Sequence, residues 1–236
     1  MSIERIRRRL PFPEETNFSK KSNPPETDYP TGDPGEFKKF IDIHKDSSFV
    51  ICGCGVSLND YNFDSFKNHI TIGVNDAGKK ISCKYLVVVN EPHTFKWGRW
   101  DSVKDNDSEY TFTHIKNLPI DKRERLVLVK LGKYEGLNLY NHGFIDYTTN
   151  SPYMAIVIAC QMGARKIALV GVDFTMNHFF GETGKHQIMR EIEKVKEQYS
   201  NLGKHLTSSG IRIANLSSQS LIESWPKMTL EEFETI

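Results

Sequence analysis

Short, continuous runs of apolar residues constrain the fold of this chain more than any other feature of its sequence. The apolar residues in these runs do not alternate with polar ones, which is the pattern of strands covered on both faces. Helical patterns separate several runs, including an apolar one over 150–162 and a charged amphipathic one over 185–200. The alternation predicts an α/β fold with a doubly wound, mainly parallel, Rossmann-like sheet. The predicted strands are 49–52, 70–74, 85–89, 126–129, 166–172 and 211–214, and short helical segments are expected at 37–44 and 218–225.

The first 34 residues differ in composition from the rest of the chain. A cluster of arginines between Arg5 and Arg9 is followed by a stretch rich in Pro, Asn, Thr and Asp. Such a segment can bury little apolar surface, so we expect an extended arm over residues 1–34 and a single domain over 35–236. The arginines could contact nucleic-acid phosphates or an anionic membrane surface, although a solvated cluster is the simpler interpretation.

Composition narrows the class of protein. The net charge of +1 over 236 residues indicates no strongly basic domain for nucleic acid. The chain has no apolar run of bilayer length, and no apolar segment follows its basic start, so we expect a cytoplasmic protein that could lie at the inner membrane surface. Its four cysteines lack zinc-site spacing, which favours buried thiols and predicts no metal ligands among them.

Candidate binding residues follow the predicted strands. Ligands of open parallel sheets bind beyond the carboxyl ends of the strands, and here those ends carry Gly53–Ser57, Asn75, Asn90 and Asp173. Gly53 and Gly55 lack a Cβ atom, so backbone amides there could approach an anion closely, and Ser57 could bind a phosphate or cap a helix. A tight turn without a ligand is the structural alternative. The full dinucleotide-binding spacing is absent because Leu58 stands where a third glycine would be.

Two further segments carry polar groups toward the same edge. Thr149, Asn150 and Ser151 precede the apolar helix, whose start could offer amides to an anion or simply be capped. The segment 177–186 contains two glycines and mixed side chains, which indicates a mobile loop over the crevice. His186 ends that loop and could act as a general base, since its ordinary pKa is near ~6.5.

Taken in their order along the chain, these motifs resemble those of the family 42 bacterial sialyltransferases over about residues 48–225. The resemblance rests on the glycine turn, the strand-end asparagines, the helix start at 150–154 and Gly171-x-Asp173-Phe174. It implies a Rossmann-like glycosyltransferase that transfers a sugar from a CMP-activated donor without a strict metal requirement. It further implies catalytic roles for His186 and Asp173, with the donor held at a larger set: Gly53, Gly55, Ser57, Asn75, Asn90, Thr149, Asn150 and Ser151.

One departure from that family leaves the donor open. The family places tyrosine hydroxyls after the Asp-Phe pair, whereas this chain has Thr175 and then Phe179 or Phe180. A phenylalanine donates no hydrogen bond, and His178 or Lys185 could take the place of the tyrosines. The sequence therefore predicts a CMP-sugar or UDP-sugar donor without specifying CMP-sialic acid.

Other interpretations remain open at this point. The glycine turn and Asp173 also resemble the 6-hydroxymethylpterin diphosphokinase-like family, which implies ATP and Mg²⁺, and a non-catalytic nucleotide-binding module is a third possibility. We expect no tightly bound cofactor, and the need for Mg²⁺ is open. The acceptor is a glycan or, given the basic arm, DNA modified in a phage, and a homo-oligomer is possible. Asp105–Asp107 has the D-x-D form of metal-dependent glycosyltransferases, but its polar surroundings predict a surface turn.

Overall fold

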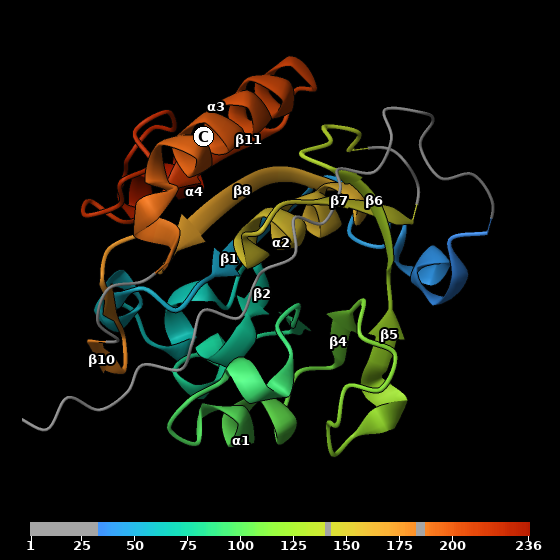
Figure 1. Ribbon diagram of the computed structural model, residues 1–236. Coiled ribbons are helices and arrows are strands. Elements are labelled where there is room, and N and C mark those ends of the chain that lie inside the picture. The colour runs from blue at the N-terminus through green and yellow to red at the C-terminus, as the bar shows by residue number, and fades with distance from the viewer. Residues whose placement is uncertain (1–32, 140–142, 183–186) are drawn as a thin grey trace, which may run out of the picture.

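A seven-stranded parallel sheet forms the centre of the protein. The computed structural model describes residues 33–139, 143–182 and 187–236, and Figure 1 shows its arrangement. The strand order is β11-β8-β1-β2-β3-β4-β5, and every neighbouring pair is parallel. This confirms the predicted α/β, Rossmann-like sheet. The strands are β1 Ser47–Cys52, β2 Ile70–Val74, β3 Tyr85–Val87, β4 Tyr110–Thr113, β5 Leu126–Leu128, β8 Ala164–Val170 and β11 Arg212–Asn215.

The central strands are apolar throughout because both faces of the sheet are covered. In β1, Phe49 and Ile51 belong to one hydrophobic cluster, whereas Val50 and Cys52 belong to another on the opposite face. All four side chains are fully buried. Continuous apolar runs therefore mark the strands at the centre of the sheet.

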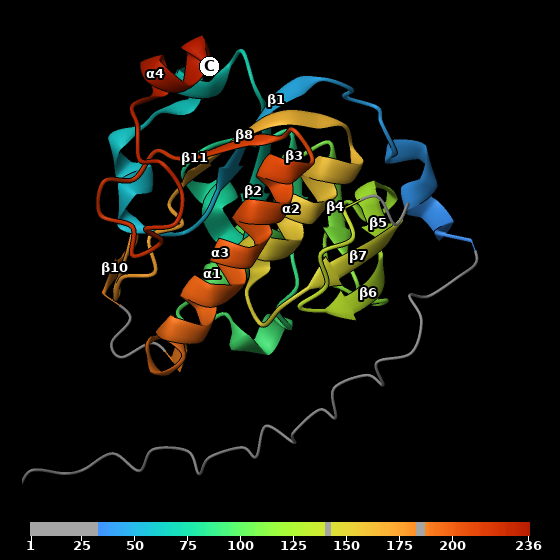
Figure 2. The same cartoon turned by 90° about the horizontal axis from the view of Figure 1, so that it is seen from above.

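Two long helices cover one face of the sheet. Helix α2, Ser151–Gln161, packs on the central strands and is buried at every position except Pro152. Helix α3, Ile192–Ser208, lies on the same side and is amphipathic, as Figures 1 and 2 show. Tyr153 of α2 and Tyr199 of α3 pack edge to face, 6.0 Å between ring centroids, which joins the two helices.

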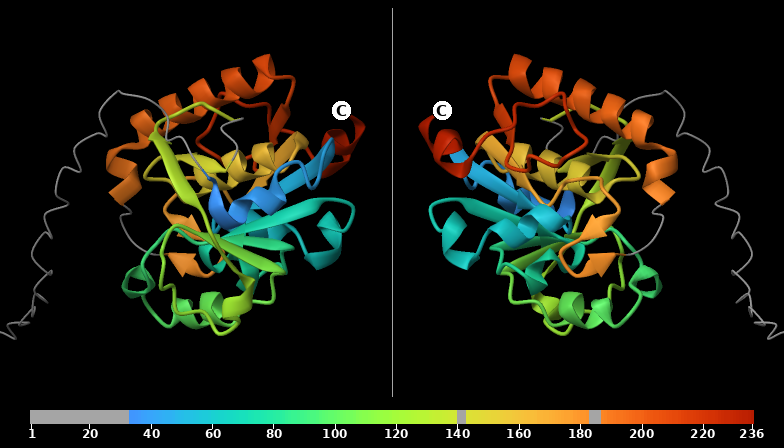
Figure 3. Two further views of the ribbon diagram at one scale, coloured as in Figure 1. Left: turned by 90° about the vertical axis from the view of Figure 1, so that its right-hand side faces the viewer. Right: turned by 90° about the vertical axis from the view of Figure 1, so that its left-hand side faces the viewer.

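The opposite face is covered by short elements. Helix α1, Arg99–Lys104, lies there (Figure 3), where Val103 packs with Leu86 of β3. The connections from β1 to β2 and from β2 to β3 contain 3₁₀ turns and no α-helix, so this layer is thinner than the α2–α3 layer. These turns are η2 Val56–Asp60, η3 Phe63–Phe66 and η4 Asn75–Lys79.

The remaining elements lie around this framework. The smaller pairs of strands are β6 Lys130–Tyr134 with β7 Phe144–Tyr147, and β9 Asn177–His178 with β10 Gly181–Glu182. The chain ends in α4 Leu230–Thr235, and the other 3₁₀ turns are η1 Gly35–Phe40, η5 Pro92–Thr94, η6 Arg123–Arg125 and η7 Gln187–Arg190. Within the described ranges no helix is long and apolar enough to cross a bilayer.

Some expected boundaries were wrong. The short helix predicted at 218–225 is irregular chain, because Ser220 donates to the Val172 carbonyl (2.9 Å) and the Trp225 indole donates to the Tyr199 carbonyl (3.0 Å). The helix expected at 185–200 is shifted, since α3 begins at Ile192. The predicted arm falls outside the described residues except for Asp33 and Pro34.

Candidate functional site

The site predicted at the strand ends lies where the order of strand addition reverses within the sheet. From β1 the chain adds β2, β3, β4 and β5 on one side, and then β8 and β11 on the other. A doubly wound sheet opens its ligand crevice at the carboxyl ends of the two strands flanking this switch point. In this protein those strands are β1 and β8, which are followed by Gly53–Ser57 and by Gly171–Asp173.

Backbone contacts between the two turns explain their glycines. The Gly53 amide donates to the Val170 carbonyl (2.8 Å), and the Gly55 amide donates to the Gly171 carbonyl (2.6 Å). A Cβ atom on Gly53 would lie 2.9 Å from the carbonyl carbon of Gly171 and closer still to its oxygen. Gly171 has a φ of +65°, in the region that favours glycine. The glycines allow the two turns to interlock.

Asp173 fixes this interlock from inside the protein. Its side chain is 1% exposed, and its two carboxylate oxygens accept hydrogen bonds from the Ser57 amide (2.8 Å) and the Ser57 hydroxyl (2.6 Å). The same hydroxyl oxygen accepts from the Gly171 amide (2.9 Å). The amides of Gly53, Gly55 and Ser57 thus donate within the protein in this arrangement, and their predicted contact with an anion stays a prediction.

Asn75 carries an unsatisfied polar atom at the end of β2. Its backbone has a φ of +55°, which asparagine tolerates better than most residues. Its side-chain oxygen is buried, and no donor in the described part of the chain reaches it. Leaving a buried acceptor without a donor costs about 1–3 kcal/mol. A ligand with a hydroxyl or amino group would relieve that cost.

A buried ion pair stands beside Asn75. Asp76 is 1% exposed; its carboxylate accepts from Arg99 Nε (2.7 Å) and also from Arg99 Nη2. Burial acts to lower the pKa of Arg99, but its hydrogen bonds to Asp76 outweigh this and raise the pKa. The Cys54 thiol also donates to Asp76 (3.3 Å), and burial raises the pKa of that thiol well above its ordinary value, which keeps it protonated.

Asn90 and the start of α2 meet at the neighbouring strand end. The Ser151 hydroxyl donates to Asn90 Oδ1 (3.0 Å), which confirms that these two predicted residues lie together. Asn150 is the N-cap residue by position, but its side-chain oxygen accepts from the Tyr199 hydroxyl (2.6 Å) and makes no cap bond. Thr149 is exposed. Asn75 directly follows β2, and Asn90 lies shortly after the neighbouring strand β3. Ser151, at the start of α2, is bonded to Asn90.

The segment after Asp173 folds back onto the glycine turn. Strands β9 and β10 form a short hairpin, and β10 lies beyond the tip of the β8 arrow in Figure 1. The Phe179 amide donates to the Cys54 carbonyl (3.0 Å), and His178 forms a bridge with Gly55. His178 stacks on Phe180, whose ring lies 4.2 Å from the Arg99 guanidinium carbon. The predicted base, His186, and Lys185 lie outside the described residues.

The sequence reasoning missed Asp76 and Arg99. Asp76 directly follows a predicted strand-end residue, so its position could have drawn attention to it. Arg99 lies 23 residues further along the chain, and no pattern in the sequence links the two.

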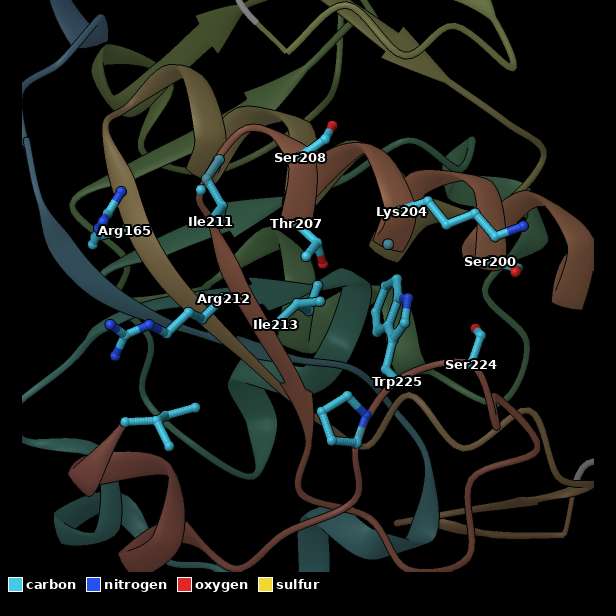
Figure 4. Close-up of a pocket in the computed structure, with 14 residues that line it drawn as sticks. Arg165, Ser200, Lys204, Thr207, Ser208, Ile211, Arg212, Ile213, Ser224 and Trp225 are labelled. Carbon is cyan, nitrogen blue, oxygen red and sulfur yellow. The ribbon is translucent and has the colours of Figure 1, made fainter.

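A separate cavity lies away from these residues. It has a volume of about 1030 Å³ and lies along β11 and α3. Figure 4 shows Arg165, Lys204 and Arg212 around it, with Trp225 between the strand and the helix. None of the predicted site residues lines it.

Elsewhere, Asp105–Asp107 forms the expected turn after α1, where Asn106 donates to the Val103 carbonyl (2.8 Å). The described residues contain no group of three or more potential metal ligands among His, Cys, Asp and Glu.

Comparison with known proteins gives a likeness in fold. No protein-family model and no curated protein sequence matches the chain. The structure is similar to that of the MAf glycosyltransferase from Magnetospirillum magneticum AMB-1, with a TM-score of 0.50 and 14% identity over 83% of this chain. This chain spans 37% of the length of that protein.

Weaker likenesses are to two Campylobacter jejuni enzymes. The sialyltransferase CstII, in complex with cytidine-5′-monophosphate, has a TM-score of 0.49 and 14% identity, covering 78% of this chain and 86% of its own. The α-2,3-sialyltransferase Cst-I has a TM-score of 0.45 and 16% identity, covering 78% and 81%. At sequence identities of 14–16%, these comparisons indicate a shared fold only.

Proposed function

We propose that this protein is a glycosyltransferase that moves a sugar from a nucleotide-activated donor of the CMP or UDP type to a hydroxyl acceptor. The observation that carries the proposal is the buried, unsatisfied Asn75 oxygen at the carboxyl edge of the sheet, beside the switch point. Nucleotides offer hydroxyl and amino donors to such an acceptor. The glycosyltransferase fold of the Magnetospirillum protein and the motif resemblance support this reaction class.

In this proposal, the binding residues divide into two groups. Asn75, Asn90 and Ser151 contact the donor, with Thr149 exposed beside the start of α2. The residues of the interlocked turns, Gly53, Gly55, Ser57 and Asp173, instead give the crevice its shape. Asn150 positions α2 against Tyr199. Phosphate contacts then come from groups outside the interlock.

A nucleotide screen tests the donor class. Thermal shifts of the full-length chain are measured with CMP, UDP, GDP and ATP, each with and without Mg²⁺. We expect CMP or UDP to raise the melting temperature, because a ligand that binds only the folded state stabilises it. A shift with ATP and Mg²⁺ alone would instead indicate the diphosphokinase, and no observation in the structure favours that alternative.

Replacing Asn75 by glycine should weaken nucleotide binding about three- to tenfold while the fold is retained. Glycine adopts the φ of +55° without strain, so the backbone survives and only the side chain is lost. Calorimetric titration with the nucleotide found in the screen measures the change. Unchanged affinity in Asn75→Gly would show that the asparagine serves the turn and would remove the main support for the proposal.

His186→Ala should reduce sugar transfer by about 10²–10⁴-fold and leave nucleotide affinity unaltered, because a general base acts on the acceptor hydroxyl. The readout is release of the nucleotide from its sugar in the presence of an acceptor panel. His205→Ala is the matched control. His205 is partly exposed near the end of α3, which leads into β11 at the edge where the strands begin. Full transfer by His186→Ala would reject the assignment of the base.

A further inference from the structure

Two of the exposed large apolar side chains belong to segments that follow the carboxyl ends of strands. Trp97 is 70% exposed and Met176 is 49% exposed. Trp97 lies in the loop after β3, and Met176 lies between Asp173 and β9. Ile43, 50% exposed, precedes β1 at the opposite edge of the sheet. An indole is the largest apolar side chain, so solvent exposure at this edge needs a reason.

The backbone of Trp97 also adopts a left-handed conformation that is rare for a bulky residue. The Arg99 amide donates to the Lys96 carbonyl (3.3 Å), which closes a turn with Trp97 and Gly98 at its centre. Their φ values are +57° and +70°. Turns with two left-handed central residues strongly prefer Gly, Asn or Asp. A bulky residue held there at a cost is a pointer to function.

The surrounding contacts hold this turn firmly. Arg99, directly after Gly98, is bound to the buried Asp76 at the end of β2. The Arg99 guanidinium carbon lies 5.6 Å from the Phe95 ring centroid and 4.2 Å from that of Phe180. The turn that carries Trp97 therefore lies beside η4, the segment that begins at Asn75 after β2.

From this geometry we infer that Trp97 is the stacking platform for a sugar ring of the acceptor. This inference rests on the proposed function and names its acceptor as a saccharide. An aromatic face packs well against the apolar C–H face of a pyranose, since the contact removes apolar surface from water.

The charges around Trp97 favour a neutral saccharide over a nucleic acid. Between residues 91 and 101 the chain carries two carboxylates, Glu91 and Asp101, and two cations, Lys96 and Arg99. Arg99 is already paired with Asp76. Nucleic-acid binding depends on positive charge near the phosphates, and the two carboxylates balance the two cations, so this loop has no net positive charge.

Glycan binding by the full-length chain tests the inference. A printed glycan array identifies a bound saccharide, and tryptophan fluorescence then measures its affinity. Trp97→Ala should weaken binding about tenfold or more, Trp97→Phe should retain most of it, and the control Ile43→Ala should bind as the parent does. Of the three tryptophans, Trp97 is exposed, Trp100 is partly buried against Phe95 and Trp225 is buried, so Trp97→Phe should also remove most of the fluorescence change.

Several results would overturn the inference. These are no glycan bound on the array, equal affinity in Trp97→Ala, or a single-stranded oligonucleotide that binds through Trp97 in place of the glycan. The nucleotide screen gives an independent answer on the donor. A nucleotide shift with Trp97-independent glycan binding would refute the platform alone, whereas Trp97-dependent glycan binding without any nucleotide shift would refute the transferase.

Discussion

Replacing Gly53 by alanine should lower the free energy of unfolding by about 3 kcal/mol. The added methyl group would overlap the backbone of Gly171, which cannot move without separating β1 from β8. Chemical denaturation monitored by circular dichroism measures the loss, provided that the transition is two-state.

Gly78 provides the matched control for this change. It lies in η4, and a Cβ atom there would meet nothing within 4 Å. Gly78→Ala should therefore change stability by less than about 1 kcal/mol, and toward greater stability, because alanine restricts the unfolded chain. Similar stabilities for Gly53→Ala and Gly78→Ala would contradict the interlock of the two turns.

Asp76→Asn should destabilise the protein by about 3 kcal/mol, since it leaves the Arg99 guanidinium partly buried without a counter-charge. Arg99 is 21% exposed and Asp76 is 1% exposed, so solvent compensates little for the lost partner. The variant keeps the volume of the side chain, which separates the charge effect from a packing defect. Denaturant titration at neutral pH measures it.

A surface ion pair, with lysine in place of arginine, serves as the comparison. Asp107 is 83% exposed and lies 2.9 Å from Lys122. Asp107→Asn should lower the stability far less than Asp76→Asn does, because water and salt screen an exposed pair. The double variant Asp76→Asn with Arg99→Gln should recover part of the loss, because it removes the unpaired cation. An equal loss of unfolding free energy in Asp76→Asn and Asp107→Asn would mean that the buried pair stabilises the fold no more than the surface pair does.

The sequence predicted the centre of the fold well and its periphery poorly. The continuous apolar runs located β1, β2 and β8 because these strands are buried on both faces. Strand β4 was missed because Thr111 and Thr113, although buried, interrupt its apolar pattern. The predicted helix at 218–225 failed because its polar side chains bind the backbone of distant segments, and local pattern does not contain that information.

The same distinction applies to the site. The strand-end rule correctly predicted that the glycine turn and Asp173 would meet. It did not predict that the amides of the turn would be satisfied by Asp173 and Gly171, because Ser57 and Asp173 are 116 residues apart in sequence. Nor could it predict the Asp76–Arg99 pair, which depends on how the loop after β3 returns over β2.

The position of β8 next to β1 has a consequence for how the chain is made. During synthesis, β1 to β5 leave the ribosome well before β8. Until β8 is made, the amides and carbonyls on the edge of β1 that pairs with β8 have no partner strand. An uncovered apolar strand edge is a template for association between nascent chains. Fragments that end before residue 164 should therefore aggregate, and chaperone capture during translation should be strongest over that interval.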